Sequence, residues 1–510
     1  MNTFGKHSSM ALASWVCALA VAIYATAVPA SGDTLDPTVP DSGAGKTSFE
    51  EYMVKINNLL PDIEKNRVSL KKSMNAIKIA EGIEDMRVSA GAMAVGKKEY
   101  QLNPQFQQDY SRGYVINSEL SKKLAATGTL FSFGAEYQNL LLSGSSRNIV
   151  QIDPATMAPV YGEMGFEKTY SYPSIFAEIT QPILNNAFGI LDRSHRKDAV
   201  MKYEIEKLKK LTGDDRALNG FKKMYFELIM YDAAVIIMTK SLDNAQEMER
   251  LIKSKYDLGM VDNDDYQNIK STVFTYKTLL LNYRHARGVL KKEIEIYLGG
   301  DDFIPVYEEL ERHYELAKRH EYAPVAFGTT ATGKLMALTV ENLDYIAEVN
   351  RNSVLPDFNL YGKVTLKSQE ETFRDSASDM NDVDYRVGFV FRYPLGNNEK
   401  SGFLENAELS VVEMKKETEK ASKEFGRLLA SVIENASAAV ERIVLIDGNI
   451  NALQSRGATE RKKYSQARLS LVNLIDTENK IAAERLNQAV EKRRLINLYF
   501  DYLSLTLRTK

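Results

Sequence analysis

Hydrophobic and polar residues alternate in two separate regions of the chain. In DYRVGFVFRY (residues 384–393), Tyr385, Val387 and Phe389 share one parity, and Asp384 and Arg386 share the other. The same alternation occurs in DFNLYGKVTLK (357–367), LFSFGAEYQNLLL (130–142) and PSIFAEITQ (173–181). A period of two is typical of a β-strand with one apolar and one polar face. The pattern therefore predicts strands in both halves of the chain.

Each strand region is followed by a long stretch without proline, from Pro182 to Pro305 and from Pro394 to the end. Long helices exclude internal prolines. In the last stretch apolar residues recur at steps of three, four or seven, at Leu471, Ile475, Ala482, Leu486, Ala489, Ile496, Phe500 and Leu503. Such a pattern predicts long paired or coiled-coil helices, longer than those of ordinary globular domains.

The two regions also end alike, in TQPILNN (180–186) and RYPLGNN (392–398). We predict that these are joints where a strand gives way to a helix, with proline closing the strand and asparagine capping the helix. The candidate joint residues are Pro182, Asn185, Asn186, Pro394, Asn397 and Asn398. Their recurrence indicates an internal duplication of a mixed unit.

The first repeat covers residues 48–300, with a helix, strands at about 86–182 and two long helices at about 188–300. The second covers 301–510, with a helix at about 305–352, strands at 354–396 and two long helices at about 402–508. MRVSAGAMAVG and GYVINSELSKKL (86–96 and 113–124) are candidates for further strands or an extra hairpin in the first repeat.

The N-terminus has the features of a secretory signal peptide. Residues 10–28 are apolar or small, and Val28 and Ala30 stand where a signal peptidase requires small residues. We predict a signal peptide over residues 1–30, cut after Ala30 or alternatively Ala27, and a flexible linker over 31–47. An uncleaved membrane anchor is the alternative. Since later helical segments carry many charges, only the two-faced strands are candidates for crossing a membrane.

Composition excludes several classes of function. Cleavage after Ala30 removes the only cysteine, so the exported chain contains no disulfide. Its 64 basic residues (65 less Lys6) nearly balance 68 acidic ones, which gives no sign of a nucleic-acid partner. The sequence shows no recognisable set of catalytic residues, so we expect that the protein is not an enzyme and binds no cofactor.

Three weaker signals have simpler explanations. GTTATGKL (328–335) resembles a phosphate-binding loop, but Leu335 replaces the required Ser or Thr, so we expect a loop before a helix. His313 and His320 share a helix face without a third metal ligand nearby. The acidic cluster at 262–265 lacks calcium-loop spacing, and we expect a polar turn between helices there.

Several segments together resemble the TolC-type outer-membrane efflux proteins of Gram-negative bacteria. They are LPDFNLYGKV (355–364), the exits ITQPILNNAFG (179–189) and FRYPLGNN (391–398), YDLGMVDNDDYQN (256–268), and the helical stretch 464–505. In the family's turn pattern, Tyr256, Gly259 and Asp265 match in the first half, and Tyr464 and Asp476 match in the second. Ala467 stands where glycine is usual, and Asn473 where an acid is common.

The resemblance implies an α+β membrane protein that forms a homotrimer. Each chain would give four strands to a shared 12-stranded β-barrel in the outer membrane, continued by a tapering periplasmic α-helical barrel. In this family the helix turns close the periplasmic tip. That nominates Asp265, Asn473 and Asp476 as gate residues, with Tyr256 and Tyr464 as hydrogen-bonding partners. The alternative is that these acids only cap helices or lie solvated at a turn.

The expected function is the outer-membrane channel component of a tripartite efflux or type I secretion system. It would be a passive duct from periplasm to exterior, working with a periplasmic adaptor protein and a proton-driven or ATP-driven inner-membrane pump. The sequence leaves the cargo open. The alternative is a periplasmic or surface coiled-coil scaffold or adhesin without channel activity.

Overall fold

The computed structural model describes residues 46–98, 106–300, 302–466, 468–469 and 471–508. The chain divides into two units, Met1–Ala44 and Gly45–Lys510, and all that follows concerns the second. The predicted signal peptide over residues 1–30 and nearly all of the predicted linker lie outside the described residues.

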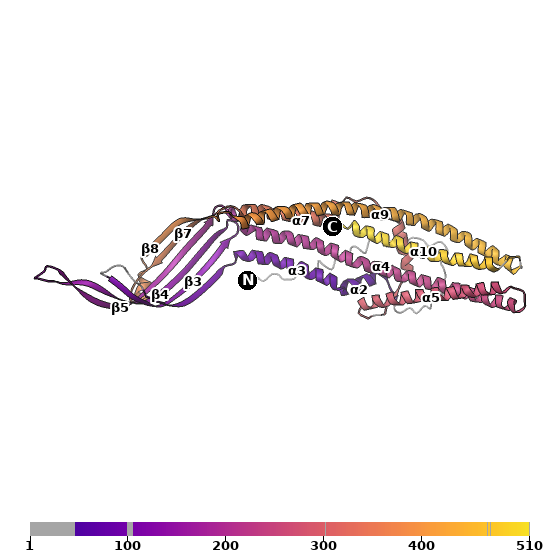
Figure 1. Ribbon diagram of the computed structural model, residues 1–510, viewed down its shortest axis with the longest axis horizontal. Coiled ribbons are helices and arrows are strands. Elements are labelled where there is room, and N and C mark those ends of the chain that lie inside the picture. Colours follow the sequence, from indigo (N-terminus) through magenta and orange to yellow (C-terminus); the bar gives the residue numbers. More distant parts are fainter. Residues whose placement is uncertain (1–45, 99–105, 301, 467, 470, 509–510) are drawn as a thin grey trace, which may run out of the picture. The chain divides into compact units, whose positions relative to one another are not determined.

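Six antiparallel strands form one sheet (Figure 1). In sheet order they are β2 (Arg87–Lys97), β3 (Phe106–Leu124), β4 (Thr129–Ile152), β5 (Pro159–Pro182), β7 (Asp357–Lys367) and β8 (Asp382–Arg392). The extra hairpin that the sequence left open is β2–β3. The four strands per chain that the family resemblance implies are therefore too few, because the β2–β3 hairpin adds two strands to β4, β5, β7 and β8.

The register gives this sheet one apolar and one polar face from edge to edge. One row of paired residues, taken strand by strand, is Val88, Leu120, Phe133, Ala177, Val364 and Tyr385. The neighbouring row is Arg87, Ser121, Ser132, Glu178, Lys363 and Arg386. Directly paired residues point to the same face and successive residues to opposite faces. The apolar row is exposed, with 79% of Val88 and 78% of Tyr385 accessible.

Four helices meet one end of the sheet. α3 (Pro61–Glu81) leads by way of a 3₁₀ turn, η1 (Gly82–Glu84), into β2, α4 (Ile190–Asp257) follows β5, α7 (Ala331–Ser353) leads into β7, and α9 (Asn398–Ser465) follows β8. They pack in the order α3, α4, α7, α9. α5 (Asn263–Tyr297) returns along α4, and α10 (Leu471–Leu505) returns along α9 and also contacts α4. Among the described residues, no helix has the length and apolar character needed to span a membrane.

The helix lengths show the duplication directly. α4 and α9 have 68 residues each, and α5 and α10 have 35 each. Both pairs start 208 positions apart, at residues 190 and 398 and at residues 263 and 471. The prolines of the two exits are instead 212 positions apart. The first exit is longer because it contains a short 3₁₀ turn, η2 (Ala187–Gly189), that the second exit lacks.

The helix predicted at about 305–352 is two helices, so that prediction is wrong. α6 (Glu308–Arg319) and α7 are separated by a link that contains Pro324 and a 3₁₀ turn, η3 (Phe327–Thr329). Proline lacks a backbone N–H and clashes with the preceding helical turn. The remaining short helices are α2 (Phe49–Leu59), which precedes α3, and α8 (Phe373–Ser378), which lies between β7 and β8.

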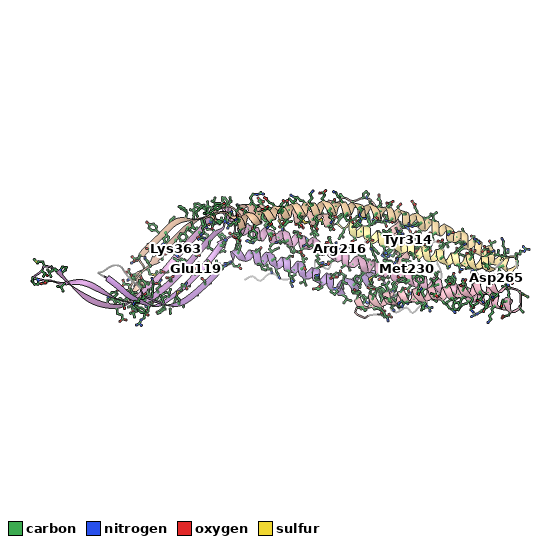
Figure 2. All side chains as sticks on the ribbon, in the orientation of Figure 1. Glu119, Arg216, Met230, Asp265, Tyr314 and Lys363 are labelled. Atoms are coloured by element: carbon green, nitrogen blue, oxygen red, sulfur yellow. The ribbon has the colours of Figure 1, made fainter. Side chains whose placement is uncertain are left out.

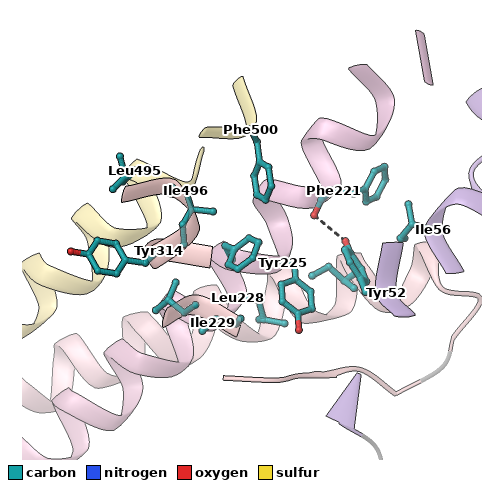
Figure 3. Close-up of a cluster of buried hydrophobic side chains, with 14 of the residues drawn as sticks. Tyr52, Ile56, Phe221, Tyr225, Leu228, Ile229, Tyr314, Leu495, Ile496 and Phe500 are labelled. Atoms are coloured by element: carbon teal, nitrogen blue, oxygen red, sulfur yellow. Dashed lines mark hydrogen bonds between the residues drawn. The ribbon is translucent and has the colours of Figure 1, made fainter. Parts of the chain in front are cut away.

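The largest core cluster, which we call the central belt, joins helices of both repeats (Figure 3). Its fully buried side chains include Tyr52 and Ile56 from α2, Phe226 from α4 and Leu495 from α10. The Tyr52 hydroxyl donates to the Phe221 carbonyl at 3.3 Å. A cluster of this kind stabilises the folded chain mainly by removing apolar surface from water. It therefore fixes the start of the first repeat onto the long helices.

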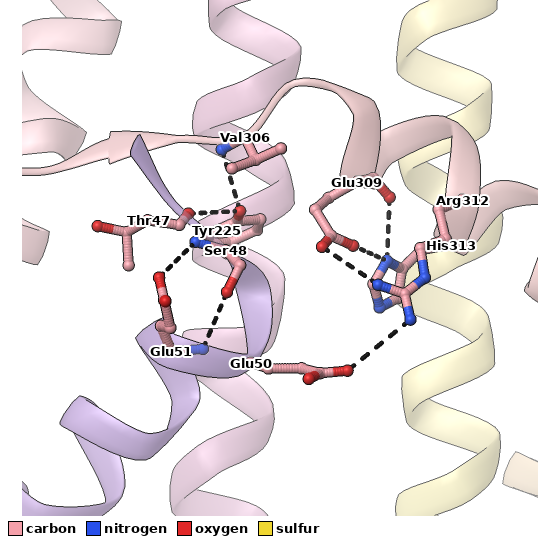
Figure 4. Close-up of polar contacts among 9 residues, drawn as sticks. All are labelled: Thr47, Ser48, Glu50, Glu51, Tyr225, Val306, Glu309, Arg312 and His313. Carbon is pink, nitrogen blue, oxygen red and sulfur yellow. Dashed lines mark hydrogen bonds and ion pairs between the residues drawn. The ribbon is translucent and has the colours of Figure 1, made fainter. Parts of the chain in front are cut away.

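Polar contacts at the belt tie the two repeats together (Figure 4). Short strands β1 (Lys46–Thr47) and β6 (Ile304–Pro305) pair in parallel. The Tyr225 hydroxyl donates to the Thr47 carbonyl at 3.0 Å and accepts from the Val306 N–H at 3.2 Å. Ser48 and Glu51 form a capping box at the start of α2. The first residues of both repeats are thus held against α4.

His313 lies in this belt among aromatic rings. Its ring centroid is 4.8 Å from that of Phe49 and 4.7 Å from that of Phe226. Burial lowers the pKa of His313 to about 4, although its Nδ1 lies 2.9 Å from the Glu309 carbonyl and 3.1 Å from the Glu309 carboxylate. Burial also raises the pKa of the Glu309 carboxyl. His313 is therefore neutral in the folded chain at pH 7.

Lowering the pH from 7 to 5 is expected to destabilise the protein through His313. In this range the unfolded chain binds a proton at His313, with an ordinary pKa near 6.5, and the folded chain does not. The predicted loss is about 2 kcal/mol at pH 5. Glu309 acts in the opposite direction, because its raised pKa lets the folded chain bind a proton more readily.

Denaturant unfolding of detergent-solubilised protein at both pH values measures the effect. His313→Phe should reduce the difference between pH 7 and pH 5, whereas His285→Gln, at an exposed position of α5, should keep it. An unchanged pH dependence in His313→Phe would contradict the assignment.

Candidate functional site

The turn between α4 and α5 is built by a glycine. α4 ends in a Schellman motif, in which the Gly259 N–H donates to the Tyr256 carbonyl and the Met260 N–H to the Lys255 carbonyl, both at 2.9 Å. Gly259 has φ +71°, a conformation that costs other residues strain. Asp265 lies in the first turn of α5, where its charge favours the helix dipole. Figure 2 shows Asp265 beside this turn.

The turn between α9 and α10 repeats this design. The Arg468 N–H donates to the Lys463 carbonyl at 2.9 Å, as in a Schellman motif. Ala467, where the family pattern has glycine, lies outside the described residues. Tyr464 stands 208 positions after Tyr256, so the two tyrosines occupy equivalent places.

The same spacing of 208 relates the gate candidates to one another. It pairs Asp265 with Asn473, and Asn268 with Asp476. Each hairpin therefore carries one acid and one amide at two positions three residues apart, in opposite order. At these two equivalent positions each hairpin therefore has one carboxylate, and Asp262 and Asp264 add two more at the turn of the first hairpin.

A contact close to the two turns joins the α4–α5 hairpin to the α9–α10 hairpin. Lys255 Nζ donates to the Tyr464 hydroxyl at 3.0 Å and lies 4.6 Å from the centroid of its ring. Tyr256 instead stacks on Tyr266 within its own hairpin, with centroids 5.4 Å apart. Lys255 was not among the predicted tip residues, because nothing in the sequence distinguishes it from the other lysines of α4. Among the described residues, Tyr464 thus contacts the other hairpin, whereas Tyr256 stacks within its own.

Other polar contacts surround the tip. The Tyr276 hydroxyl donates to Asn479 Oδ1, which links α5 to α10. Asp476 pairs with Lys480 at 2.6 Å on its own helix, and both side chains are about half exposed. Asn473 is exposed and Asp265 is half-buried. The charge of Asp476 is therefore partly offset by its neighbour.

The first strand–helix joint is tightly packed. Pro182 is the last residue of β5 and is buried. Asn186, also buried, accepts from the Leu191 N–H at 2.9 Å and donates to Asp192 at 2.8 Å. Lys123 Nζ lies 2.7 Å from the same Asp192 carboxylate. Asn186 therefore satisfies a donor of the first turn of α4, and the half-buried Asn185 precedes it.

The second joint differs in its details. Pro394 lies two residues beyond the end of β8 and is exposed. Asn397 precedes α9 with φ +45°, and its side chain donates to the Val354 carbonyl at 3.1 Å. It makes no cap hydrogen bond to α9, so the predicted capping role of Asn397 is wrong. The residue instead ties this joint to the end of α7, and Asn398 is the exposed first residue of α9.

The segment that resembles a phosphate-binding loop has a structural explanation. Thr330 caps α7 by accepting from the Gly333 N–H at 3.0 Å. A Cβ at Gly333 would lie 2.0 Å from the Phe327 carbonyl oxygen, so close packing requires glycine. In the described part of the chain, no group of three or more potential ligands is placed to hold a metal ion.

Solved structures similar to this chain are outer-membrane proteins. The outer-membrane protein VceC from Vibrio cholerae matches with a TM-score of 0.61 and 12% identity, over 90% of this chain and 96% of that one. CusC, a protein whose structures are described in terms of transmembrane channel formation, matches with a TM-score of 0.60 and 9% identity. The match covers 90% of this chain and 92% of CusC. The open state of the MtrE outer-membrane channel from Neisseria gonorrhoeae matches at 0.53 with 11% identity, over 89% of each chain.

No protein-family model matches the sequence, and no curated protein matches it either. Identities near 10% establish the fold alone. The chain therefore has the fold of these outer-membrane channel proteins, which confirms its resemblance to the TolC-type outer-membrane efflux proteins.

Proposed function

We propose that the chain is the outer-membrane channel component of a tripartite efflux or type I secretion system. The observation that carries the proposal is the two-faced sheet, whose apolar face is exposed on every strand and which continues into long paired helices. An exposed apolar face of this extent fits a lipid surface. A polar opposite face fits a water-filled duct.

Closure of the duct requires more than one chain. Open sheet edges do not occur within the hydrocarbon region, because unpaired backbone groups there cost several kcal/mol each. We propose a homotrimer whose sheets close one ring in the outer membrane. Its helices extend into the periplasm, where an adaptor protein joins them to a proton-driven or ATP-driven inner-membrane pump. The channel itself is passive and performs no bond chemistry.

The helix turns are the proposed periplasmic gate. The Lys255–Tyr464 contact holds the two hairpins of one chain together and supports a closed resting state. Asp265 and Asp476, repeated by three-fold symmetry, would place rings of carboxylates at the pore. Such rings attract cations and disfavour anions.

Replacing both acids, by Asp265→Asn with Asp476→Asn, is expected to reduce the preference for cations over anions. Reversal potentials of single channels under a salt gradient measure it. Glu405→Gln, an exposed change on α9 far along the helix from the tip, is the matched control and should leave the preference unchanged. An unaltered preference in the double variant would assign the acids to helix capping alone.

The competing function is a periplasmic or surface scaffold or adhesin, and cell fractionation separates the two. A channel should be extracted from outer membranes by detergent as a heat-sensitive trimer. Recovery as a soluble periplasmic monomer would refute the proposed function.

A further inference from the structure

The sheet of one chain has two open edges. Among the described residues, β2 pairs only with β3 and β8 only with β7. Both edge strands have 11 residues. Because the six strands alternate in direction, β2 and β8 run antiparallel to each other. The edges are therefore equal in length and suited to antiparallel pairing with each other in different copies of the chain.

We propose that the outer side of β8 pairs with the outer side of β2 from a second copy of this chain, so that three copies close a ring of 18 strands. Three sheets of six strands give this number, in place of the 12 strands that the family resemblance implies. The inference rests on the proposed trimeric channel and adds the strands that form its subunit contact.

The face pattern places β2 and β3 in the same lipid-facing surface as the other strands. Val88 and Leu120 continue the exposed apolar row that crosses β4, β5, β7 and β8. Ala90, Ala92 and Ala94 follow Val88 at the same parity. A hairpin lying outside the membrane ring would have no reason to keep this register.

β4 has no free edge for a neighbouring copy. β3 pairs with it from Thr129 to Ser146, and β5 pairs with its other side from Leu130 to Ile152. A ring made only of β4, β5, β7 and β8 would need β3 to separate from β4. The turn between β3 and β4, residues 125–128, also packs against the first joint, since an added Cβ on Gly189 would meet the Ala125 carbonyl. The β2–β3 hairpin is therefore an integral part of the sheet.

The apolar faces of the two edges are complementary in size. On β8, Tyr385, Phe389 and Phe391 are large and 58–78% exposed. On β2 the corresponding face carries alanines at 90, 92 and 94. Aromatic side chains pack well across small residues of a neighbouring strand. Pairing of β8 with β2 would thus cover aromatic groups that one chain leaves open.

The helices next to the two edge strands support the same contact between copies of the chain. α3 precedes β2 and α9 follows β8, and they are the outer members of the helix layer. α3 exposes Met74 and Ile79, and α9 exposes Phe403, Leu409 and Val412. A copy that joins β8 to β2 would also bring α9 against α3 and bury these side chains.

The widths of the two layers agree with six strands. With about 4.8 Å between strands and a tilt of about 40°, six strands span about 38 Å and four span about 25 Å. The four helices that meet the sheet span about 36 Å at a spacing of about 9 Å. The circumference of a ring of 18 strands therefore matches that of the ring of helices that continues it.

Engineered cysteine pairs test the contact, and the only native cysteine, Cys17, lies in the predicted signal peptide. Tyr385→Cys is combined in turn with cysteine at each β2 position of the apolar face: Val88, Ala90, Ala92, Ala94 and Gly96. The matched set combines Tyr385→Cys with Phe131→Cys, Phe133→Cys or Ala135→Cys on β4. Directly opposed positions come within disulfide reach. Outer membranes are oxidised and analysed on non-reducing gels.

We expect covalent dimers and trimers with at least one β2 position and none with β4 or with Tyr385→Cys alone. Cross-links to β4 instead of β2 would overturn the inference but leave a trimeric channel. A trimer that forms no cross-link at any β2 position would overturn it as well. A soluble monomer would refute the proposed function itself, so the two failures are distinguishable.

Discussion

Replacing Gly189 by alanine is expected to remove most of the assembled protein from the membrane. Gly189 has φ +65°, where other residues are strained. A Cβ there would lie 1.9 Å from the Ala125 carbonyl oxygen, and this neighbour is backbone that cannot rotate away. The β3–β4 turn and the start of α4 would have to separate. We expect a loss of about 2–4 kcal/mol, measured by denaturant unfolding and by the amount of trimer in outer membranes.

Gly402→Ala is the matched control for this prediction. Gly402 lies inside α9, and a Cβ there would meet no heavy atom within 4 Å. Alanine is preferred over glycine in helices, so this variant should be neutral or more stable by about 0.5–1 kcal/mol. Normal assembly and unchanged unfolding of Gly189→Ala would show that the joint is not packed as described.

Replacing Lys255 by alanine is expected to raise the single-channel conductance several-fold. Lys255 provides both the hydrogen bond and the cation–π contact to Tyr464, across 209 positions of sequence. Without it the two hairpins of a chain lose this contact at the tip, and the closed state is less favoured. Tyr464→Phe keeps the ring but loses the hydroxyl, so its conductance should lie between those of the wild type and Lys255→Ala.

Lys253→Ala separates this effect from a general loss of positive charge. Lys253 lies two residues away in α4 with its side chain exposed. Its replacement should leave the conductance at the wild-type value. Equal conductances in Lys253→Ala, Lys255→Ala and the wild type would show that the Lys255 contact does not hold the gate.

The sequence predicted those strands in which large apolar residues alternate with charged ones. The peptides around Phe133, Ile175, Val364 and Phe389 all lie in strands of the sheet. β2 escaped a firm prediction because Ala90, Gly91, Ala92 and Ala94 give little contrast between faces. Its membership of the sheet depends on pairing with β3, which is a tertiary property.

The joints show a second limit of sequence analysis. The repeated motif of a proline followed by paired asparagines correctly located two places where a strand is followed by a helix. It suggested helix capping by the asparagine pairs of both exits, yet Asn186 accepts a hydrogen bond from the first turn of α4, whereas Asn397 donates to the Val354 carbonyl and makes no cap hydrogen bond to α9. The difference arises from η2 in the first joint, which shifts the asparagines relative to the helix start. The contact of Lys255 with Tyr464 at the tip depends on the packing of two hairpins. The local sequence pattern around either residue therefore does not predict it.

The central claim is that copies of this chain form a transmembrane channel. Its most direct test is the conductance of purified protein in planar lipid bilayers. We expect discrete conductance steps of uniform size, which are larger in Lys255→Ala than in the wild type. Folded, detergent-extracted protein that inserts into the bilayer without any conductance, in both wild type and Lys255→Ala, would contradict it.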